Sequence, residues 1–373
     1  MRVAALDLVE VELPLVQPFE TSFGVERRRR VLLVALRTPD GLTGWGECVA
    51  AEAPRYSSET VATARSVLVD HLVPALARLA SATPESFARA TGWVRGHRMA
   101  RAAVEMALWD LAAKRRGTSL ARALGGRRRR VEVGVSVGIH PTVPRLLAAV
   151  GGYLDAGYLR VKLKVRPGWD EVPVRAVRRE YPDLRLWVDA NQAYGIDSLP
   201  AIARWARRHD VEIFEQPFPE RALSLHAKLV RTGATRVALD ESVVDAATYE
   251  EAEQLGAMGA LNVKPGRVGG LAMARDLAGR ARRRRISVWV GGMLETGIGR
   301  AHNVALASME PFTLPADLSA SARYFAHDLI GSPFELGPGS TLAVPTGAGI
   351  GVELDSRWFR RYVRRRRRYV LHR

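Results

Sequence analysis

The hydrophobic pattern of the chain changes character near residue 125. Before this point, apolar and polar residues alternate in short runs, which predicts strands at Val3–Leu13, Val31–Arg37 and Leu42–Val49. Helical periodicity follows over Ser58–Leu79 and His97–Arg116, and Gly117 ends the second helix. Residues 1–125 are therefore expected to form an α+β domain.

From Val131 onward, short β runs alternate with helical stretches. The predicted strands are Val131–Ile139, Leu159–Val165, Leu184–Ala190, Glu212–Glu215, Val237–Leu239, Ala260–Val263 and Ile286–Val290. This alternation predicts an α/β domain with a parallel sheet over residues 126–318, in which FTLPADLS supplies the last strand. Residues 319–373 are expected to return to the first domain and to end in a helix over Trp358–Val370.

Five ionisable residues stand at or just after the ends of these predicted strands. Lys164, Asp189, Glu215, Asp240 and Lys264 follow one another at intervals of 25, 26, 25 and 24 residues. One βα unit of a barrel takes roughly this length (~250 residues over eight units), and the carboxyl ends of barrel strands meet at one mouth. We therefore expect the five side chains to converge there.

Three carboxylates between two amines suggest a specific chemistry. Asp189, Glu215 and Asp240 offer hard oxygen ligands of the kind that Mg²⁺ prefers, and Mn²⁺ or Co²⁺ could replace it. Lys164 and Lys264 should face each other across the ion, so that a carboxylate substrate would place its α-carbon between them.

The composition of the chain also indicates that these lysines have a special role. The net charge is +17, yet only five of the 56 basic residues are lysine, and the arginine runs at 27–30, 127–130, 282–285 and 364–368 are interpreted as solvated surface. Arginine stays protonated, whereas a lysine can lose its proton beside another cation. Lys162 lies on the same strand face as Lys164 and is expected to lower the pKa of that amine, and Arg267 could act likewise near Lys264.

Other function classes are not expected. The arginine runs are not interleaved with aromatic residues, so a nucleic-acid partner is not predicted, although a basic barrel that binds nucleic acid stays an alternative. Hydrophobic residues make up 47% of the chain, but no apolar stretch is long enough to span a membrane. Acidic residues interrupt the first apolar run, and Cys48 is the single cysteine. We expect a cytoplasmic protein without an intrachain disulfide.

Longer strings resemble a known family. GWGECV, KLKVRPGWD, VDANQAY, LDES, LNVKPGRVGG, GGMLETGIGRAHNVALAS and FTLPADLSAS are similar to the o-succinylbenzoate synthase / N-succinylamino acid racemase (N-acylamino acid racemase) family. That family lies in the muconate-lactonizing-enzyme subgroup of the enolase superfamily. The resemblance implies a (β/α)7β TIM-type barrel under an α+β capping domain, and a homo-oligomer that acts on a small carboxylate.

The resemblance also implies roles for residues. Asp189, Glu215 and Asp240 would hold the metal, with Lys164 and Lys264 as the acid/base pair. Further residues would line the substrate pocket: Ser136, Asn191, Gly292, Met293, Leu294 and, in the specificity loop Phe19–Gly24, Phe23. The site suits both reactions of the family, which are dehydration to o-succinylbenzoate for menaquinone synthesis and racemisation of N-succinyl or other N-acylamino acids. Asp317-Leu318-Ser319 replaces the Asp-x-Asp of dipeptide epimerases, which favours a substrate without a free ammonium group.

Overall fold

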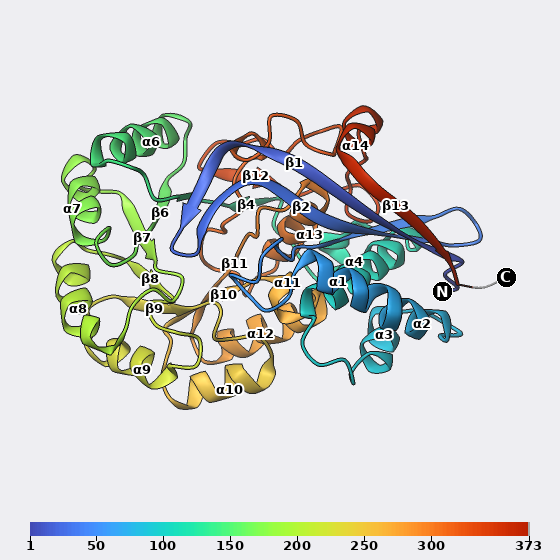
Figure 1. Cartoon of the computed structure of the whole chain (residues 1–373), viewed down its shortest axis with the longest axis horizontal. Coiled ribbons are helices and arrows are strands. Elements are labelled where there is room, and N and C mark those ends of the chain that lie inside the picture. The colour runs from blue at the N-terminus through green and yellow to red at the C-terminus, as the bar shows by residue number, and fades with distance from the viewer. Residues whose placement is uncertain (372–373) are drawn as a thin grey trace.

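A four-stranded antiparallel sheet forms the centre of the capping region. In the computed structural model, which describes residues 1–371, its order is β13-β1-β2-β3 (Figure 1). The strands are β1 (Ala5–Thr21), β2 (Gly24–Arg37), β3 (Thr43–Cys48) and β13 (Val363–Val370). The three predicted N-terminal strands are confirmed, but β1 and β2 extend further, because their ends form a long hairpin that reaches over the barrel.

Five short helices and one long helix cover this sheet. They are α1 (Val61–Val67), the π-helix η1 (Leu68–Leu72), α2 (Val73–Ala77), α3 (Pro84–Ala90), α4 (Arg98–Arg115) and α5 (Leu120–Leu124). The predicted helix His97–Arg116 is confirmed as α4. The predicted helix Ser58–Leu79 starts only at Val61, where Thr60 caps it, and a π-turn interrupts it. Pro74 follows that turn and has no N–H to donate.

Seven parallel strands curl into the barrel. Their order follows the chain: β5 (Val135–Val137), β6 (Arg160–Lys164), β7 (Arg185–Asp189), β8 (Ile213–Glu215), β9 (Arg236–Leu239), β10 (Ala260–Val263) and β11 (Ser287–Val290). The helices around them are α6 (Val143–Asp155), α7 (Glu171–Glu180), α8 (Leu199–Arg208), α9 (Leu223–Arg231), α10 (Ala246–Gln254), α11 (Pro265–Val268), α12 (Leu271–Arg283) and α13 (Gly297–Ala307). The predicted α/β barrel with a cap is confirmed. No helix of residues 1–371 combines the length and the apolar character needed to cross a membrane.

The eighth position of the barrel is filled by an irregular segment. The predicted strand in FTLPADLS does not form as a regular strand, since Pro315 interrupts it. Its backbone nevertheless bonds to both neighbours: Asp317 N donates to Val290 O, and Ala316 N donates to Glu132 O (both 2.9 Å). The short pair β4 (Arg130–Glu132) and β12 (Thr341–Ala343) adjoins this closure. Trp187 and Trp289 fill the barrel interior, with ring centroids 5.0 Å apart.

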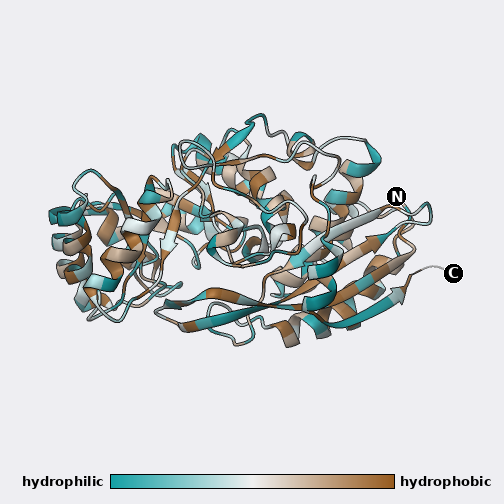
Figure 2. Cartoon of the chain, turned by 90° about the horizontal axis from the view of Figure 1, so that it is seen from above, coloured by the Kyte–Doolittle hydropathy of each residue, from teal (hydrophilic) through white to brown (hydrophobic). Residues whose placement is uncertain are grey.

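The C-terminal prediction is wrong in its second half. The helix α14 (Ser356–Tyr362) is followed by β13, not by more helix, because this strand pairs with the free edge of β1. Arg366 and Arg368 of β13 reach Asp7 of β1, which is fully buried. Figure 2 shows β13 as a mostly hydrophilic strand leading to the C-terminus.

The interpretation of the arginine runs as solvated surface is also wrong in part. Arg29 is only 5% exposed and donates a hydrogen bond to the carbonyl of Val49. Arg128 is exposed, as that interpretation expects, but it also binds four carbonyl groups at and after the end of α13, including that of Phe312 at 2.6 Å. Arginine therefore serves this fold as a structural cation as well as a surface residue.

The segment Phe19–Gly24 forms the tip of the β1–β2 hairpin and closes over the barrel mouth. Glu20 O accepts from Ile139 N (2.9 Å), and its carboxylate pairs with Arg166 (3.2 Å). Ser22 Oγ donates to Asn191 O (3.2 Å). In this structure the predicted specificity loop is thus docked on the barrel.

Candidate active site

The five regularly spaced ionisable residues meet at one mouth of the barrel. Lys164, Asp189 and Glu215 are the last residues of β6, β7 and β8, and they are aligned across the sheet. Asp240 and Lys264 come directly after β9 and β10. Parallel strands in register bring their carboxyl ends together, so the prediction of a shared mouth is confirmed.

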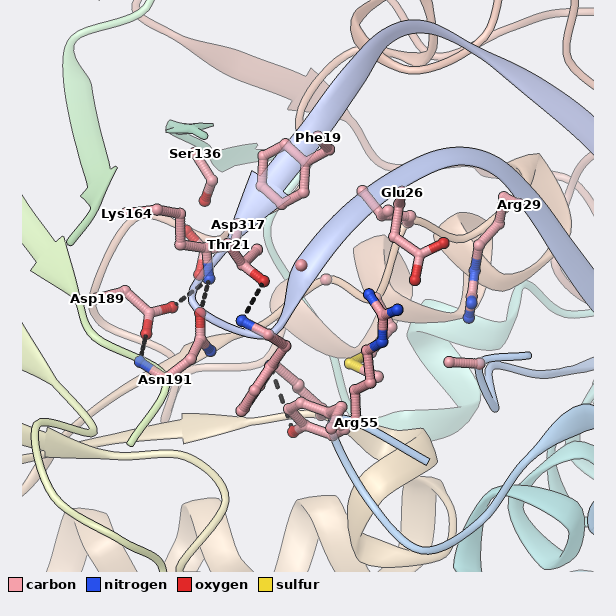
Figure 3. Close-up of a pocket in the computed structure, with 18 of the residues that line it drawn as sticks. Phe19, Thr21, Glu26, Arg29, Arg55, Ser136, Lys164, Asp189, Asn191 and Asp317 are labelled. Carbon is pink, nitrogen blue, oxygen red and sulfur yellow. Dashed lines mark hydrogen bonds and ion pairs between the residues drawn. The ribbon is translucent and has the colours of Figure 1, made fainter. Parts of the chain in front are cut away.

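Lys164 and Lys264 approach the same cavity from different strands. Lys164 Nζ lies 2.6 Å from Asp189 Oδ2 and donates to Asn191 Oδ1 at 2.8 Å (Figure 3). Lys264 Nζ lies 2.5 Å from Asp240 Oδ2. Both lysine residues are more than nine-tenths buried, and both line the cavity. The structure therefore presents two separate amines, each beside its own carboxylate.

Lys162 occupies a cluster of acids below these amines. Its Nζ lies 2.6 Å from Glu215 Oε2, 2.5 Å from Asp317 Oδ2 and 3.7 Å from Asp189 Oδ2. Burial would lower the pKa of Lys162, but the three carboxylates outweigh it and hold that pKa above its ordinary value. Lys162 is thus a fixed cation. Because Lys162 and Lys164 approach the same oxygen of Asp189, the closeness predicted for the two amines is present.

Asp240 has more hydrogen-bonding partners than could be predicted from its position in the series of regularly spaced residues. Besides Lys264, it accepts from Tyr56 OH at 2.8 Å and from Arg267. Arg267 also donates to Val243 O at 2.9 Å, which holds its buried guanidinium in place. Burial would raise the pKa of Asp240, but Lys264 and Arg267 keep it well below its usual range. Tyr56 comes from the cap, and no periodicity in the sequence connects it with a barrel strand.

All six residues expected to contact substrate line this same cavity. Its lining includes Ser136, Asn191, Gly292, Met293, Leu294 and Phe23. Position 292 requires glycine for a steric reason, because a Cβ at this position would lie 2.5 Å from the carbonyl oxygen of Asp317. Phe19 and Thr21 of the predicted specificity loop also line it, whereas sequence reasoning did not single out several other lining residues: Glu26, Arg29, Arg55, Tyr56 and Tyr324.

Comparisons with known proteins agree with this architecture. Residues 4–125 match the model of the mandelate racemase / muconate lactonizing enzyme N-terminal domain, and residues 145–358 match that of the enolase C-terminal domain-like family. The chain belongs to the mandelate racemase / muconate lactonizing enzyme family of the enolase superfamily.

Named relatives of this family extend over nearly the whole chain. An N-succinylamino acid racemase of Amycolatopsis is 47% identical over 353 residues, which are 94% of this chain and 95% of that protein. An o-succinylbenzoate synthase of Listeria innocua is 40% identical, over 96% of this chain and 95% of its own length. The crystal structure of an enolase superfamily member from Listeria innocua has a TM-score of 0.95 and 39% identity, with full coverage of both chains.

Enzymes of the mandelate racemase / muconate lactonizing enzyme family generally depend on a divalent metal. As they stand in residues 1–371, no three His, Cys, Asp or Glu side chains form a group that could hold such an ion. The reason is visible at the mouth: Asp189, Glu215 and Asp240 each point to a lysine instead.

The donor chemistry of these acids still fits a divalent cation. Burial raises the pKa of Glu215 to about 7, and the nearby charges of Asp189 and Asp240 add to this effect. Burial likewise raises the pKa of Glu241 to about 8, and its Oε2 is buried with no hydrogen-bond partner. A divalent cation prefers oxygen ligands, and its charge would stabilise several carboxylates that lie close together.

Proposed function

We propose that this chain is a divalent-metal-dependent o-succinylbenzoate synthase. Its substrate would be 2-succinyl-6-hydroxy-2,4-cyclohexadiene-1-carboxylate, and its product would enter menaquinone synthesis. The observation that carries the proposal is the pair Lys164 and Lys264, which line one cavity on either side of Asp189, Glu215 and Asp240. Full-length similarity to several proteins named o-succinylbenzoate synthase supports the choice of substrate.

In the proposed reaction, Lys164 acts as base and then as acid. Its Nζ removes the proton next to the substrate carboxylate, and the same proton then goes to the departing hydroxyl group. One water leaves, the ring becomes aromatic, and the amine returns to its starting state. Lys264 remains an ammonium group that stabilises the negative charge of the enediolate. Mg²⁺, or Mn²⁺ or Co²⁺ in its place, held by Asp189, Glu215 and Asp240, would supply Lewis-acid stabilisation of that charge.

The rest of the cavity would position the substrate. Asn191 holds Lys164 through its Oδ1 and donates to Glu241 at 3.2 Å, so the amine approaches the substrate from a fixed direction. The hairpin tip with Phe23 covers the cavity and would limit the access of water.

A direct assay tests this proposal. The purified chain is incubated with the cyclohexadiene substrate and Mg²⁺, and dehydration is followed by the absorbance of the aromatic product. We expect turnover that EDTA abolishes and added Mg²⁺ restores, and that Lys164→Ala loses. No dehydration with the metal present would refute the proposal, and turnover that survives Lys264→Ala would refute the role given to that cation.

A second reaction deserves the same test. The 47% identity to an N-succinylamino acid racemase, together with two lysine amines that line one cavity, favours racemisation of N-succinylamino acids at this site. One lysine would remove the α-proton and the other would return one from the opposite face. N-succinyl-phenylalanine in D₂O would then acquire deuterium at the α-carbon while it racemises. Absence of α-deuteration would remove this activity.

We propose that the enzyme acts in the cytoplasm as a homo-oligomer. Its functional units would be a cap over residues 1–125, a barrel over 126–318 and a segment over 319–373 that returns to the cap. Sedimentation equilibrium at micromolar concentration tests the oligomer, and a single species of 41.0 kDa would contradict it.

A further inference from the structure

The cavity is chemically different at its two ends. At the barrel end lie Lys164, Asp189 and Asn191, where the amine of Lys164 donates to the carboxylate of Asp189 and to the amide oxygen of Asn191. At the cap end lie Arg29 and Arg55 (Figure 3). Figure 3 shows these two arginines on the side of the cavity away from Lys164. The proposed reaction needs only the barrel end, so the cap-end cations call for another explanation.

Arg55 is a cation held at the cavity wall. It lies in the loop after β3, and its guanidinium is packed directly against Gly24 at the hairpin tip, where a side chain on that glycine would collide with it. Gly24 also has a φ of +132°, which only glycine adopts readily. Among the ion pairs formed within residues 1–371, none involves Arg55, and its side chain is exposed. Its charge is therefore available to a ligand.

Arg29 adds a second positive charge from the buried side. The residue is 5% exposed, and its Nη2 donates to the carbonyl of Val49. Its Nε is buried and has no hydrogen-bond partner among the described residues. A buried, unsatisfied donor of a charged group is costly unless a ligand meets it. Glu26 is the one acidic residue of the cap-end lining, so two cations face one anion there.

We propose that Arg55, supported by Arg29, binds a second carboxylate of the substrate, distal to the one at the reacting carbon. These arginines would make the enzyme selective for dicarboxylates over monocarboxylates of the same shape. This inference rests on the proposed function for the position of the reacting carboxylate. It goes further by assigning the distal group to named residues of the cap. Guanidinium groups suit carboxylates because they donate in parallel pairs.

The test compares two substrates that differ only at the distal end. N-succinyl-phenylalanine carries the second carboxylate, and N-butanoyl-phenylalanine has a methyl group in its place. We expect Arg55→Gln to lower kcat/KM for the succinyl substrate about 10- to 100-fold, as for loss of a charge-assisted hydrogen bond, and to change the butanoyl substrate less than about threefold. Glu26→Gln should raise the preference for the succinyl substrate. Arg27→Gln, an exposed arginine on the same strand, is the matched control and should leave both values unchanged.

A binding measurement keeps the two proposals separate. The dissociation constants of o-succinylbenzoate and 2-butanoylbenzoate are measured by calorimetry, with Mg²⁺ present, for the wild type and Arg55→Gln. We expect at least about tenfold tighter binding of the dicarboxylate by the wild type, and loss of most of that preference in the variant. If the wild type turns over neither substrate class, the proposed function fails, while this measurement still decides the assignment of Arg55. An equal effect of Arg55→Gln on both ligands, or no effect, would overturn the inference.

Discussion

Two buried carboxylates in this molecule are each surrounded by cations, and they serve different ends. Asp240, at the barrel mouth, binds Lys264, Arg267 and Tyr56 beside the cavity. Asp7, in the middle of the cap sheet, binds three arginines, one from β2 and two from β13. Both carboxyl groups have a pKa well below the ordinary value, since neighbouring cations outweigh the effect of burial.

The difference lies in the kind of cation, since one of the two cations at Asp240 is a lysine, whereas all three at Asp7 are arginines. Arginine keeps its charge at any working pH, so the cluster at Asp7 can join strands that are far apart in sequence without changing state. Lysine can give up a proton, so a lysine beside a carboxylate at a cavity is suited to chemistry. In a chain with only five lysines, three lie at the barrel mouth and none lies in the cap sheet. The following variants test this division.

The largest effect on activity is expected when a lysine at the barrel mouth is replaced by arginine. Lys164→Arg keeps the positive charge near Asp189 but removes the group that can lose a proton. We expect kcat to fall at least about 1,000-fold, within the range for loss of a general base. Initial rates of dehydration measure this, with circular dichroism to confirm the fold. The control Lys228→Arg, on an exposed face of α9, should be fully active. More than a tenth of wild-type kcat in Lys164→Arg would contradict the assignment.

Removing the carboxylate in the cap should affect stability instead of turnover. Asp7→Asn leaves three arginines without their shared anion, and we expect the free energy of unfolding to fall by about 1–3 kcal/mol, reduced by the partial exposure of those arginines. Urea denaturation measures it. Asp40→Asn is the matched control, since its pair with Arg115 is about half exposed, and it should leave the free energy of unfolding nearly unchanged. Equal effects of the two variants would refute the structural role of the Asp7 cluster.

The low pKa of Asp7 predicts that the stability of the folded chain depends on pH. The pKa of Asp7 is lower in the folded chain than its ordinary value of 3.8, so the folded state favours the charged form. Its contribution to stability is complete above that value and is lost as pH falls below it toward the folded pKa. We expect the stability difference between wild type and Asp7→Asn to be constant from about pH 5 to 7 and to shrink below about pH 4. The measurement is the thermal unfolding midpoint of the wild type and of Asp7→Asn across this pH range. If Asp7 contributes nothing, the two midpoints will fall in parallel as the pH is lowered.

The smallest effect is expected from exchanging the cation type in the cap. Arg366→Lys keeps a charge near Asp7 but loses the planar donor pair, and its side chain is 46% exposed. We expect a cost below about 1 kcal/mol and no change in turnover. A loss of activity comparable to that of Lys164→Arg would show that the division between structural arginine and reactive lysine is wrong. The measurement pairs urea denaturation with the dehydration assay.

Several features of the molecule could be predicted from local patterns. The spacing of Lys164, Asp189 and Lys264 follows from the length of a βα unit, and that regularity alone predicts that they lie at one mouth of the barrel. The long helix α4 follows from its apolar periodicity and from Gly117. The pocket residues Gly292 and Phe23 were assigned individually through family resemblance, because isolated glycines and aromatic residues have many other uses.

Other features depend on segments that are distant in sequence. The pattern of Trp358–Val370 does not distinguish helix from strand, since five consecutive arginines have no apolar period, and β1 decides the matter by offering an unpaired edge. Tyr56 and Arg55 reach the cavity from a cap loop, and Arg29 is buried beside the distant Val49, to whose carbonyl group it donates.

The amino-acid sequence alone determined the α/β repeat, the order of the ionisable residues along it and the scarcity of lysine, because these are properties of periodicity and composition. The tertiary structure decided which cation meets which carboxylate, how the eighth barrel position closes around Pro315, and which cap residues form the far wall of the cavity. Such contacts depend on the distance between side chains in space, and separation along the chain does not constrain that distance once strands and domains pack together.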